Sequence, residues 1–356
     1  MSLQIVLSLL TGLVLLVVGA ELLVRGAARL AARFGIPPLI IGLTVVAFGT
    51  SAPETAVSVQ SALAGRGDLA VGNVVGSNIA NVLLILGLSA LIAPLTVSRQ
   101  LIRLDVPIMI GASVAVFALA WDGALSRVDG ALLFAAILTY TLFLIVQSGK
   151  ESRSPSDEFA AEFGRLDPHW AWSLSLVLIG LALLVGGANL LVDGAVQLAR
   201  ALGFSELVIG LTVIAVGTSL PELSTSLIAA IKGQRDIAVG NIVGSNIFNI
   251  LCVLGLAALV SPASISVSPN ALTFDFPIMI AVALACLPVF FAGYSINRWE
   301  GLLFLGYYVA YTGYLLLYSV GWPHAWLLGN ALLGYALPLT AVTLAVIAGH
   351  AWRRQR

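Results

Sequence analysis

Residues 42–87 read GLTVVAFGTSAPETAVSVQSALAGRGDLAVGNVVGSNIANVLLILG, and residues 210–255 read GLTVIAVGTSLPELSTSLIAAIKGQRDIAVGNIVGSNIFNILCVLG. Aligned without gaps at an offset of 168, 27 of these 46 positions are identical. The similarity continues outward, because LDVPIMI at 104–110 matches FDFPIMI at 274–280. A repeat of this length indicates that the chain consists of two copies of one structural unit.

The composition points to a membrane. Of 356 residues, 60% are hydrophobic and only 10% are charged, and the mean hydropathy is +1.04. A soluble domain carries about 25% charged residues, so a water-soluble enzyme is excluded. Equal totals of 17 basic and 17 acidic residues argue against a nucleic-acid partner. Cys252 and Cys286 stand in apolar runs and are predicted to be small core residues. The three histidines share no metal-ligand spacing.

Eleven segments are long and apolar enough to cross a membrane as helices, which takes about 20 residues each. These segments are 3–24, 37–64, 69–94, 104–121, 128–147, 171–192, 205–232, 237–260, 273–292, 299–320 and 325–349. Pro53 and Pro221 interrupt the second and seventh segments, which are therefore expected to be broken. The first segment is followed by Arg25, Arg29 and Arg33, which predicts an uncleaved helix.

Loop charges predict the orientation. With the N-terminus outside, the inner loops and the C-terminal tail hold fourteen Lys and Arg residues, and the outer loops hold only Arg66, Arg127 and Arg200. Basic residues concentrate on the cytoplasmic side of membrane proteins. The N-terminus is therefore predicted outside and the C-terminus in the cytoplasm.

Each copy of the repeat comprises five helices, and because five is odd the second copy enters the membrane from the opposite side. The predicted fold is an all-α polytopic membrane protein with two inverted five-helix repeats, ten helices in total, plus one extra C-terminal helix. The predicted domains are 1–147 (first repeat), 148–169 (cytoplasmic linker), 170–320 (second repeat) and 321–356 (extra helix and basic tail). Inverted repeats with interrupted helices are typical of secondary transporters, whose substrate site lies at the repeat interface.

Glu54 and Glu222 occupy matching positions deep in apolar segments. An acidic residue at a helix centre costs about 2.5–3.5 kcal/mol, so such residues are functional by default. No Lys or Arg lies inside a predicted segment to neutralise them, which leaves cations or protons as partners. Two protonated carboxyls bonded across helices are the structural alternative.

The neighbours of both glutamates offer oxygen atoms only. Thr50 and Ser51 precede Glu54, Thr218 and Ser219 precede Glu222, and the prolines are expected to free backbone oxygens around Ala47, Thr50, Ala215 and Thr218. Calcium takes 6–8 oxygen ligands. Because two negative charges balance one divalent ion or two monovalent ions, one shared site can alternate between calcium and sodium.

The next helix of each copy adds Ser77 and Asn81, or Ser245 and Asn249, on one helical face. Polar contact between helices is the alternative for these serines, and it is the preferred interpretation for Asn73, Asn78, Asn241 and Asn246. Asp68 and Asp236 are predicted to be N-caps. Capping or dipole compensation is expected for Asp105 and Asp275. Glu21 and its counterpart Asn189 are not expected to be ligands.

The paired GTSxPE and GNxVGSNIxN blocks resemble the alpha-repeats of the cation/calcium exchanger superfamily, and within it the prokaryotic sodium/calcium exchangers. The resemblance covers roughly residues 1–320 and implies an antiporter in the prokaryotic inner membrane with no enzymatic activity. It implies no prosthetic group and no protein partner, only transported Ca²⁺ and Na⁺ and the lipid bilayer. By resemblance, calcium binds at Glu54 and Glu222 with backbone oxygens of Thr50 and Thr218, sodium binds at Ala47, Ser51, Ala215, Ser219, Ser77 and Ser245, and Asn81 and Asn249 complete the centre.

The sequence departs from the family pattern in two places. Potassium-dependent members carry a carboxylate at the position of Asn249, where this chain has an amide. The segment 325–349 exceeds the ten-helix pattern. Proton/calcium exchange by the same glutamates is the alternative within the class. An intramembrane hydrolase with these glutamates as an acid/base pair and a passive calcium channel are the alternatives outside it, and the duplicated, proline-broken segments favour a carrier.

Overall fold

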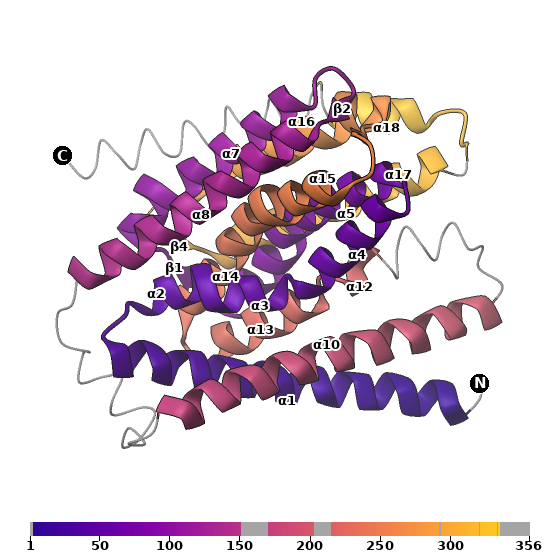
Figure 1. Cartoon of the computed structure of the whole chain (residues 1–356). Coiled ribbons are helices and arrows are strands. Elements are labelled where there is room, and N and C mark those ends of the chain that lie inside the picture. The colour runs from indigo at the N-terminus through magenta and orange to yellow at the C-terminus, as the bar shows by residue number, and fades with distance from the viewer. Residues whose placement is uncertain are drawn as a thin grey trace.

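Helices make up almost the whole of the computed structural model, which describes residues 3–150, 170–202, 215–291, 293–319, 321–332 and 334 (Figure 1). Stretches of π-helix are labelled η. The first half contains α1 (Leu3–Phe34), α2 (Pro38–Ile41), η1 (Gly42–Val46), α3 (Ala47–Thr50), α4 (Ala52–Leu63), α5 (Gly67–Ala80), η2 (Asn81–Leu86), α6 (Gly87–Ile92), η3 (Leu101–Asp105), α7 (Val106–Leu119) and α8 (Arg127–Lys150).

The second half repeats this order. It contains α10 (Trp170–Ala201), α12 (Ala215–Gly217), α13 (Leu220–Ile231), α14 (Arg235–Phe248), η5 (Asn249–Leu254), α15 (Gly255–Val260), η6 (Ala271–Asp275), α16 (Phe276–Phe291) and α17 (Arg298–Ser319), followed by α18 (Ala325–Ala331). The predicted linker lies outside the described residues from 151 onward, and α8 continues to Lys150.

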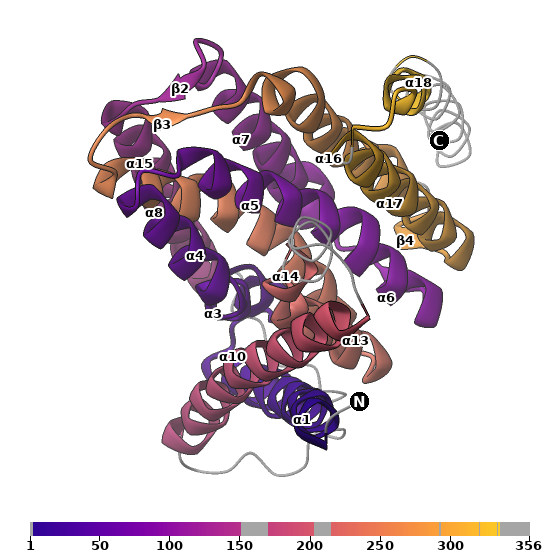
Figure 2. The ribbon, with the colours of Figure 1, turned by 90° about the vertical axis from the view of Figure 1, so that its right-hand side faces the viewer.

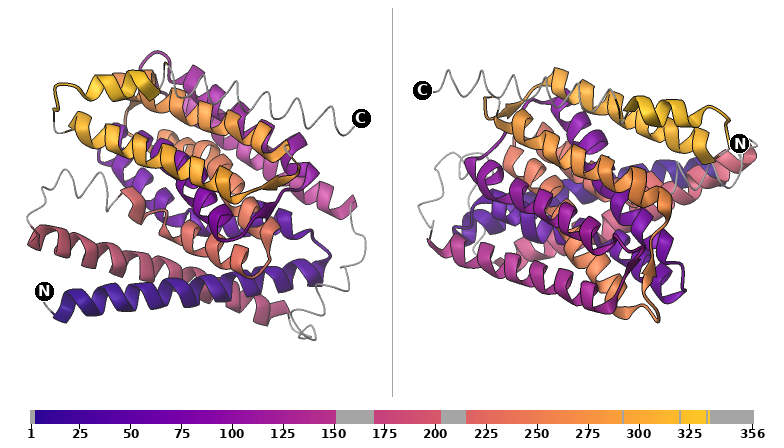
Figure 3. Two further views of the ribbon diagram at one scale, coloured as in Figure 1. Left: turned by 180° about the vertical axis from the view of Figure 1, so that it is seen from behind. Right: turned by 90° about the horizontal axis from the view of Figure 1, so that it is seen from above.

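Within the described ranges, eight helices are long and apolar enough to cross a membrane, or nine when one bent pair is counted as a span. Segments 205–232 and 325–349 lie partly outside those ranges, so the total of eleven stays a prediction. The start of the extra helix is described as α18, which packs against α17 on the face of the molecule opposite α1 and α10 (Figure 3).

The first helix is longer than predicted. Segment 3–24 is part of α1, which continues to Phe34, so Arg25, Arg29 and Arg33 lie within the helix and not after it. At 1.5 Å per residue a helix of this length measures about 48 Å, against about 30 Å for the hydrocarbon core. The prediction was wrong because the apolar segment ends before the helix does. Of the three, Arg33 lies in the last turn of the helix, where its dipole favours a positive charge.

The helices α1 and α10, which begin the two halves, pack side by side as an antiparallel pair that forms a layer of its own (Figures 1 and 2). Glycines bring the two backbones together: a Cβ on Gly19 would lie 2.9 Å from the Gly180 carbonyl oxygen, and one on Gly187 would lie 2.9 Å from that of Gly12. Small residues permit such close contact between membrane helices. Equivalent helices that run in opposite directions are what inverted repeats require.

Two further glycine contacts join the halves in the same reciprocal manner. Gly87 of α6 meets Gly301 of α17, where a Cβ on Gly301 would lie 2.6 Å from the Gly87 carbonyl oxygen. Gly130 of α8 meets Gly255 of α15, with a Cβ on Gly130 lying 2.8 Å from the Gly255 carbonyl oxygen. Because Gly87 and Gly255 are repeat equivalents, both contacts are versions of one packing arrangement.

Four two-residue strands connect the halves, and the sequence did not predict them. β1 (Leu95–Thr96) pairs antiparallel with β4 (Ser295–Ile296), and β2 (Ala124–Leu125) pairs antiparallel with β3 (Ile265–Ser266). The first pair joins the strand after α6 to the strand before α17, and the second pair joins the strand after α15 to the strand before α8. The two pairs are therefore equivalent in the repeat.

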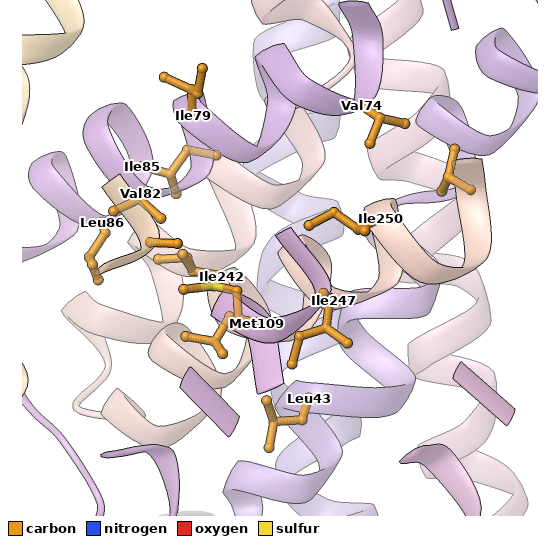
Figure 4. Close-up of a cluster of buried hydrophobic side chains, with 14 of the residues drawn as sticks. Leu43, Val74, Ile79, Val82, Ile85, Leu86, Met109, Ile242, Ile247 and Ile250 are labelled. Carbon is orange, nitrogen blue, oxygen red and sulfur yellow. The ribbon is translucent and has the colours of Figure 1, made fainter. Parts of the chain in front are cut away.

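The centre of the molecule is formed by α5 and η2 of the first half and α14 and η5 of the second. Their apolar side chains pack into one buried cluster with Leu43 and Met109 (Figure 4). Cys252 and Cys286 are buried and unbonded to each other, which confirms their predicted place in the core. The polar residues predicted to bind ions in these segments are buried as well: Glu54, Glu222, Asn81, Asn249, Ser77 and Ser245.

Candidate ion-binding site

The interrupted helices break at Ser51 and Ser219, as the prolines predicted. The helical segments before and after Ser51 are bent by 47°. Ser51 has φ −79° and ψ 11°, and Ser219 has φ −88° and ψ 9°. Pro53 and Pro221 then lie in the first turn of α4 and α13, where a helix needs no backbone donor.

Glu54 and Glu222 lie in the first turn of these new helices, and both side chains are fully buried. The N-terminus of a helix carries a partial positive charge that stabilises a carboxylate. Each glutamate accepts a hydrogen bond from the other half: Ser219 Oγ donates to Glu54 Oε1 and Ser51 Oγ donates to Glu222 Oε1, both at 3.1 Å. Because Ser51 lies three residues before Glu54 and Ser219 three residues before Glu222, the two crossed bonds bring both carboxylates to one interface between the halves.

Among the buried oxygen atoms of the described residues that have no hydrogen-bond partner, six belong to repeat-equivalent residues, and the helices α4 and α13 that carry the glutamates contact η5 and η2, which begin with the asparagines of this set. They form three repeat-related pairs: Glu54 Oε2 with Glu222 Oε2, Ser77 Oγ with Ser245 Oγ, and Asn81 Oδ1 with Asn249 Oδ1. An unsatisfied buried polar atom costs about 1–3 kcal/mol and is rare in folded proteins. A set made of oxygens alone suits a hard cation.

Asn73 of α5 and Asn241 of α14 each bond to the threonine at the break of the opposite half. Thr50 Oγ1 donates to Asn241 Oδ1 at 3.1 Å, and Thr218 Oγ1 donates to Asn73 Oδ1 at 3.4 Å. Asn73 Nδ2 in turn donates to the Glu54 carbonyl oxygen at 3.2 Å. These contacts between helices agree with the interpretation preferred for both asparagines from sequence.

Ser58 and Ser226 belong to the same arrangement, although the sequence interpretation did not include them. Asn73 Nδ2 donates to Ser58 Oγ and Asn241 Nδ2 donates to Ser226 Oγ, each at 2.9 Å. The two serines are identical at the repeat offset, which is the signal that could have revealed them.

The Ala47 carbonyl is not freed by the break, contrary to expectation. It accepts a hydrogen bond from the Ser51 N–H at 3.0 Å. The helical bonding pattern continues through Ser51, because the N–H that Pro53 lacks would donate to the carbonyl of Gly49, four residues before it, and not to that of Ala47. In the second half the Ser219 N–H donates to the Val216 carbonyl at 3.2 Å, so the turn at Ala215 is different.

Asn81 and Asn249 each begin a stretch of π-helix, η2 and η5. Asn81 Nδ2 donates to Asn246 Oδ1 at 3.0 Å, and Asn249 Nδ2 donates to Asn78 Oδ1 at 3.2 Å. π-Helical turns are rare in proteins, but those that occur are often found at functional sites. No residue pattern in the sequence predicts them.

Four aspartates have partners other than those predicted. Asp68 and Asp236 are not N-caps, because Arg66 and Gln234 hold those positions, and Asp68 Oδ1 accepts from Ser266 Oγ at 2.5 Å.

Asp105 and Asp275 do not begin helices, because η3 and η6 extend each helix backward. Tyr140 Oη donates to Asp105 at 2.8 Å and Tyr311 Oη donates to Asp275 at 3.0 Å. The capping prediction was wrong because proline marks the first α-helical turn, and the π-helical turn before it leaves no sequence signal.

The structure thus brings together, from both halves, two carboxylates and a set of neutral oxygens inside a membrane-embedded fold. This combination defines a membrane transporter for cations. Residues 4–146 and 172–317 match the family described as "Sodium/calcium exchanger protein". The chain belongs to this family of exchangers.

Known relatives agree. The chain is 44% identical over 280 residues to the "Inner membrane protein YrbG" of Escherichia coli (strain K12), which covers 78% of this chain and 85% of the relative. It is 35% identical over 337 residues to the "Sodium/calcium exchanger MaX1" of Methanosarcina acetivorans, covering 85% of this chain and 96% of the relative. A solved structure of the sodium-calcium exchanger NCX_Mj is similar with a TM-score of 0.75 and 33% identity, covering 87% of this chain and 97% of the other. The protein is therefore an integral membrane protein of the cation/calcium exchange class.

Proposed function

We propose that this protein is a sodium/calcium antiporter in which Glu54 and Glu222 form one site shared by the two ions. The observation that supports this most strongly is the reciprocal pair of hydrogen bonds from Ser51 to Glu222 and from Ser219 to Glu54. Because each half completes the carboxylate of the other, the site exists only at their interface. Midplane sites at the interface of inverted repeats are typical of secondary transporters.

The proposed calcium ligands are six of the buried oxygens that have no hydrogen-bond partner in the described chain, those of Glu54, Glu222, Ser77, Ser245, Asn81 and Asn249. Six is within the range of 6–8 that calcium takes, and the backbone oxygens of Thr50 and Thr218 are proposed as further ligands. Two carboxylates neutralise one calcium ion or two sodium ions. The central amides add no third charge.

Sodium is proposed to use the flanks of the same site. Ser51 and Ser219 donate to the glutamates here, and a hydroxyl can rotate so that its oxygen faces a cation. Ala47 and Ala215 are proposed to contribute backbone oxygens, Ala47 through the lone pair that the Ser51 N–H leaves open, and Ser77 and Ser245 their hydroxyl oxygens, as the family resemblance implies. Sodium at these positions competes with calcium for the carboxylates, so the two ions bind alternately and the protein acts as an antiporter.

Alternating access is proposed to come from movement of one helix group against the other. The pair α1 and α10 forms a separate layer in Figure 2, and its helices pack chiefly against each other. A layer of this kind can move as a unit past the interrupted helices, and so expose the site to one side of the membrane at a time.

The proposed placement follows the sequence charges, with the N-terminus outside, the C-terminus in the cytoplasm and the chain in the inner membrane. The similarity to an inner membrane protein of Escherichia coli supports this location. The division into repeats at 1–147 and 170–320, with a cytoplasmic linker at 148–169 and the extra helix and tail at 321–356, stays a prediction.

Proton/calcium exchange is the second candidate. Glu54 and Glu222 are fully buried, and a buried carboxyl can carry a proton in place of a sodium ion. The repeated serine and threonine oxygens beside each glutamate favour sodium, because a proton needs no such ligands.

Calcium uptake into liposomes that contain the purified protein distinguishes the candidates. Liposomes loaded with sodium are diluted into sodium-free or sodium-containing buffer with radioactive calcium, and a matched set carries only a pH gradient. We expect uptake only when sodium can leave down its gradient. Uptake driven by the pH gradient alone would overturn sodium coupling in favour of proton coupling, and uptake that ignores both gradients would contradict antiport.

A further inference from the structure

Two buried methionines stand behind the central amides. Met109 of α7 and Met279 of α16 occupy equivalent positions in the matched LDVPIMI and FDFPIMI motifs, and their exposed fractions are 1% and 2%. Each thioether meets an amide of the opposite half: Asn246 Nδ2 lies 3.4 Å from Met109 Sδ, and Asn78 Nδ2 lies 3.8 Å from Met279 Sδ. The same contact is thus made twice, once in each repeat.

These contacts continue to the candidate ion ligands. The Asn246 amide donates to Met109 through its NH₂ group and accepts from Asn81 Nδ2 at 3.0 Å through Oδ1. Asn81 Oδ1, the far end of this chain of bonds, is buried and has no hydrogen-bond partner in the described part of the protein. In the other half the order is Met279, Asn78, Asn249, and it ends at Asn249 Oδ1 in the same way.

Each thioether constrains which way its amide faces: Met109 Sδ is the acceptor for Asn246 Nδ2, whereas Asn78 Nδ2 has both Met279 Sδ and the Asn246 carbonyl oxygen, the latter at 3.2 Å, as acceptors. A thioether sulfur accepts a hydrogen bond and cannot donate one, whereas an amide has a donor end and an acceptor end. If Asn246 were flipped, its oxygen would face the sulfur and its NH₂ group would face the NH₂ group of Asn81. Met109 lies among apolar side chains such as Ile242 and Ile247 (Figure 4), whose side chains offer no competing acceptor.

We propose that Met109 and Met279 are positioning residues for the ion site, which hold Asn246 and Asn78 in one orientation and thereby direct Asn81 Oδ1 and Asn249 Oδ1 at the ion. This inference rests on the proposed function. It also gives a physical reason for an amide at position 249: a carboxylate there has no N–H to donate to Asn78 Oδ1.

Two substitutions of Met109 separate positioning from packing. Met109→Leu keeps the approximate volume and removes the acceptor, and Met109→Gln has a similar length and supplies a carbonyl oxygen as acceptor. Leucine for methionine is well tolerated in a core, whereas a buried glutamine is not. A packing role therefore predicts better function for the leucine variant, and the positioning role predicts the reverse.

The measurement is calcium uptake by sodium-loaded liposomes as a function of calcium concentration. We expect Met109→Leu to raise the KM for calcium by about three- to tenfold with little change in maximal rate, since one hydrogen bond is lost. Met109→Gln should return the KM to within about twofold of the unmodified protein, although its thermal unfolding temperature falls. Met279→Leu should raise the KM less than Met109→Leu, because Asn78 Nδ2 keeps the Asn246 carbonyl oxygen as an acceptor, and Met279→Gln should return the KM in the same way.

Ile278→Leu is the matched control, because Ile278 is a buried apolar neighbour of Met279 and lies outside the chain of bonds. Its KM should stay unchanged. An unchanged KM in both leucine variants would overturn the inference, and so would a glutamine variant whose KM exceeds that of the leucine variant. Absence of sodium-driven uptake by the unmodified protein would instead contradict the proposed function.

Discussion

The centre of the molecule and its edge preserve the duplication to different degrees. At the centre, Ser51 and Ser219 make the same hydrogen bond to the opposite glutamate at the same distance of 3.1 Å. At the edge, Glu21 of α1 bonds to Lys232 Nζ at 2.5 Å and to Arg25 Nη2 at 2.6 Å. The equivalent positions are Asn189, Ala64 and Asp193, so no matching ion pair can form there.

This difference reflects what each region must do. An antiporter presents one ligand set to both sides of the membrane, and a symmetric centre does so without preference. An ion pair at one end only connects α1 to the end of α13 in the conformation described here. We therefore expect the edge to influence which conformation is more stable, and the centre to determine which ions bind.

Neutralising the carboxylates should have the largest effect and should be symmetric. Glu54→Gln and Glu222→Gln each remove one of two negative charges from a buried site, where charges interact strongly. We expect each to lower sodium-driven calcium uptake by about 100-fold or more, with both proteins still folded by thermal unfolding. Normal exchange by either variant would show that the two halves do not contribute equally.

Removing the serine hydroxyls should have the next largest effect. A hydrogen bond to a charged group contributes about 1.5–3 kcal/mol, so Ser51→Ala and Ser219→Ala should each weaken calcium uptake by about 10- to 100-fold. The initial rate of uptake at low calcium concentration measures this. The two serine–glutamate bonds have equal length, so the symmetric centre predicts equal impairment of the two variants. Impairment of one variant alone would contradict that symmetry.

The contact between α1 and α10 can be tested with adjacent glycines. A Cβ on Gly187 would lie 2.9 Å from the Gly12 carbonyl oxygen, whereas one on Gly186 meets no atom of the described chain within 4 Å. Gly187→Leu should lower the stability by about 1–3 kcal/mol, as overpacking does.

Gly186→Leu is the matched control and should leave the unfolding temperature nearly unchanged. Thermal unfolding in detergent measures both variants. Equal behaviour of the two would mean that the glycines do not set the distance between these helices.

The ion pair at the edge should have the smallest effect. Partly exposed ion pairs contribute about 0.2–1 kcal/mol, so Lys232→Ala should change apparent calcium affinity by no more than about fivefold. We expect the change to differ between the two membrane sides, measured with inside-out and right-side-out vesicles. Arg235→Ala removes a positive charge from the same region and is the control. If Lys232→Ala changed the apparent calcium affinity equally on both membrane sides, the ion pair would not favour one conformation over the other.

The sequence allowed the general architecture to be predicted, because duplication and hydropathy are properties of the chain itself. The inverted relation followed from an odd number of segments, and the antiparallel pair α1 and α10 agrees with it. The break before Glu54 was also predictable, since Pro53 cannot continue a helix interior.

What could not be predicted depends on partners distant in the sequence. Asp105 bonds to Tyr140, 35 residues away, and Asn246 contacts Met109, 137 residues away. Hydropathy identifies apolar segments and does not say which polar atoms meet inside them. The expectation that the Ala47 carbonyl is free was wrong for a related reason. The local geometry at a helix break decides which carbonyl oxygens keep a hydrogen-bond donor.

Calcium binding to the purified protein at equilibrium, measured at several sodium concentrations, tests the shared site most directly. The account predicts one calcium ion per chain and an apparent dissociation constant that rises with sodium more steeply than in direct proportion, because more than one sodium ion replaces each calcium ion. It also predicts loss of this binding in Glu54→Gln. Calcium binding that is indifferent to sodium, or that persists in Glu54→Gln, would contradict the account.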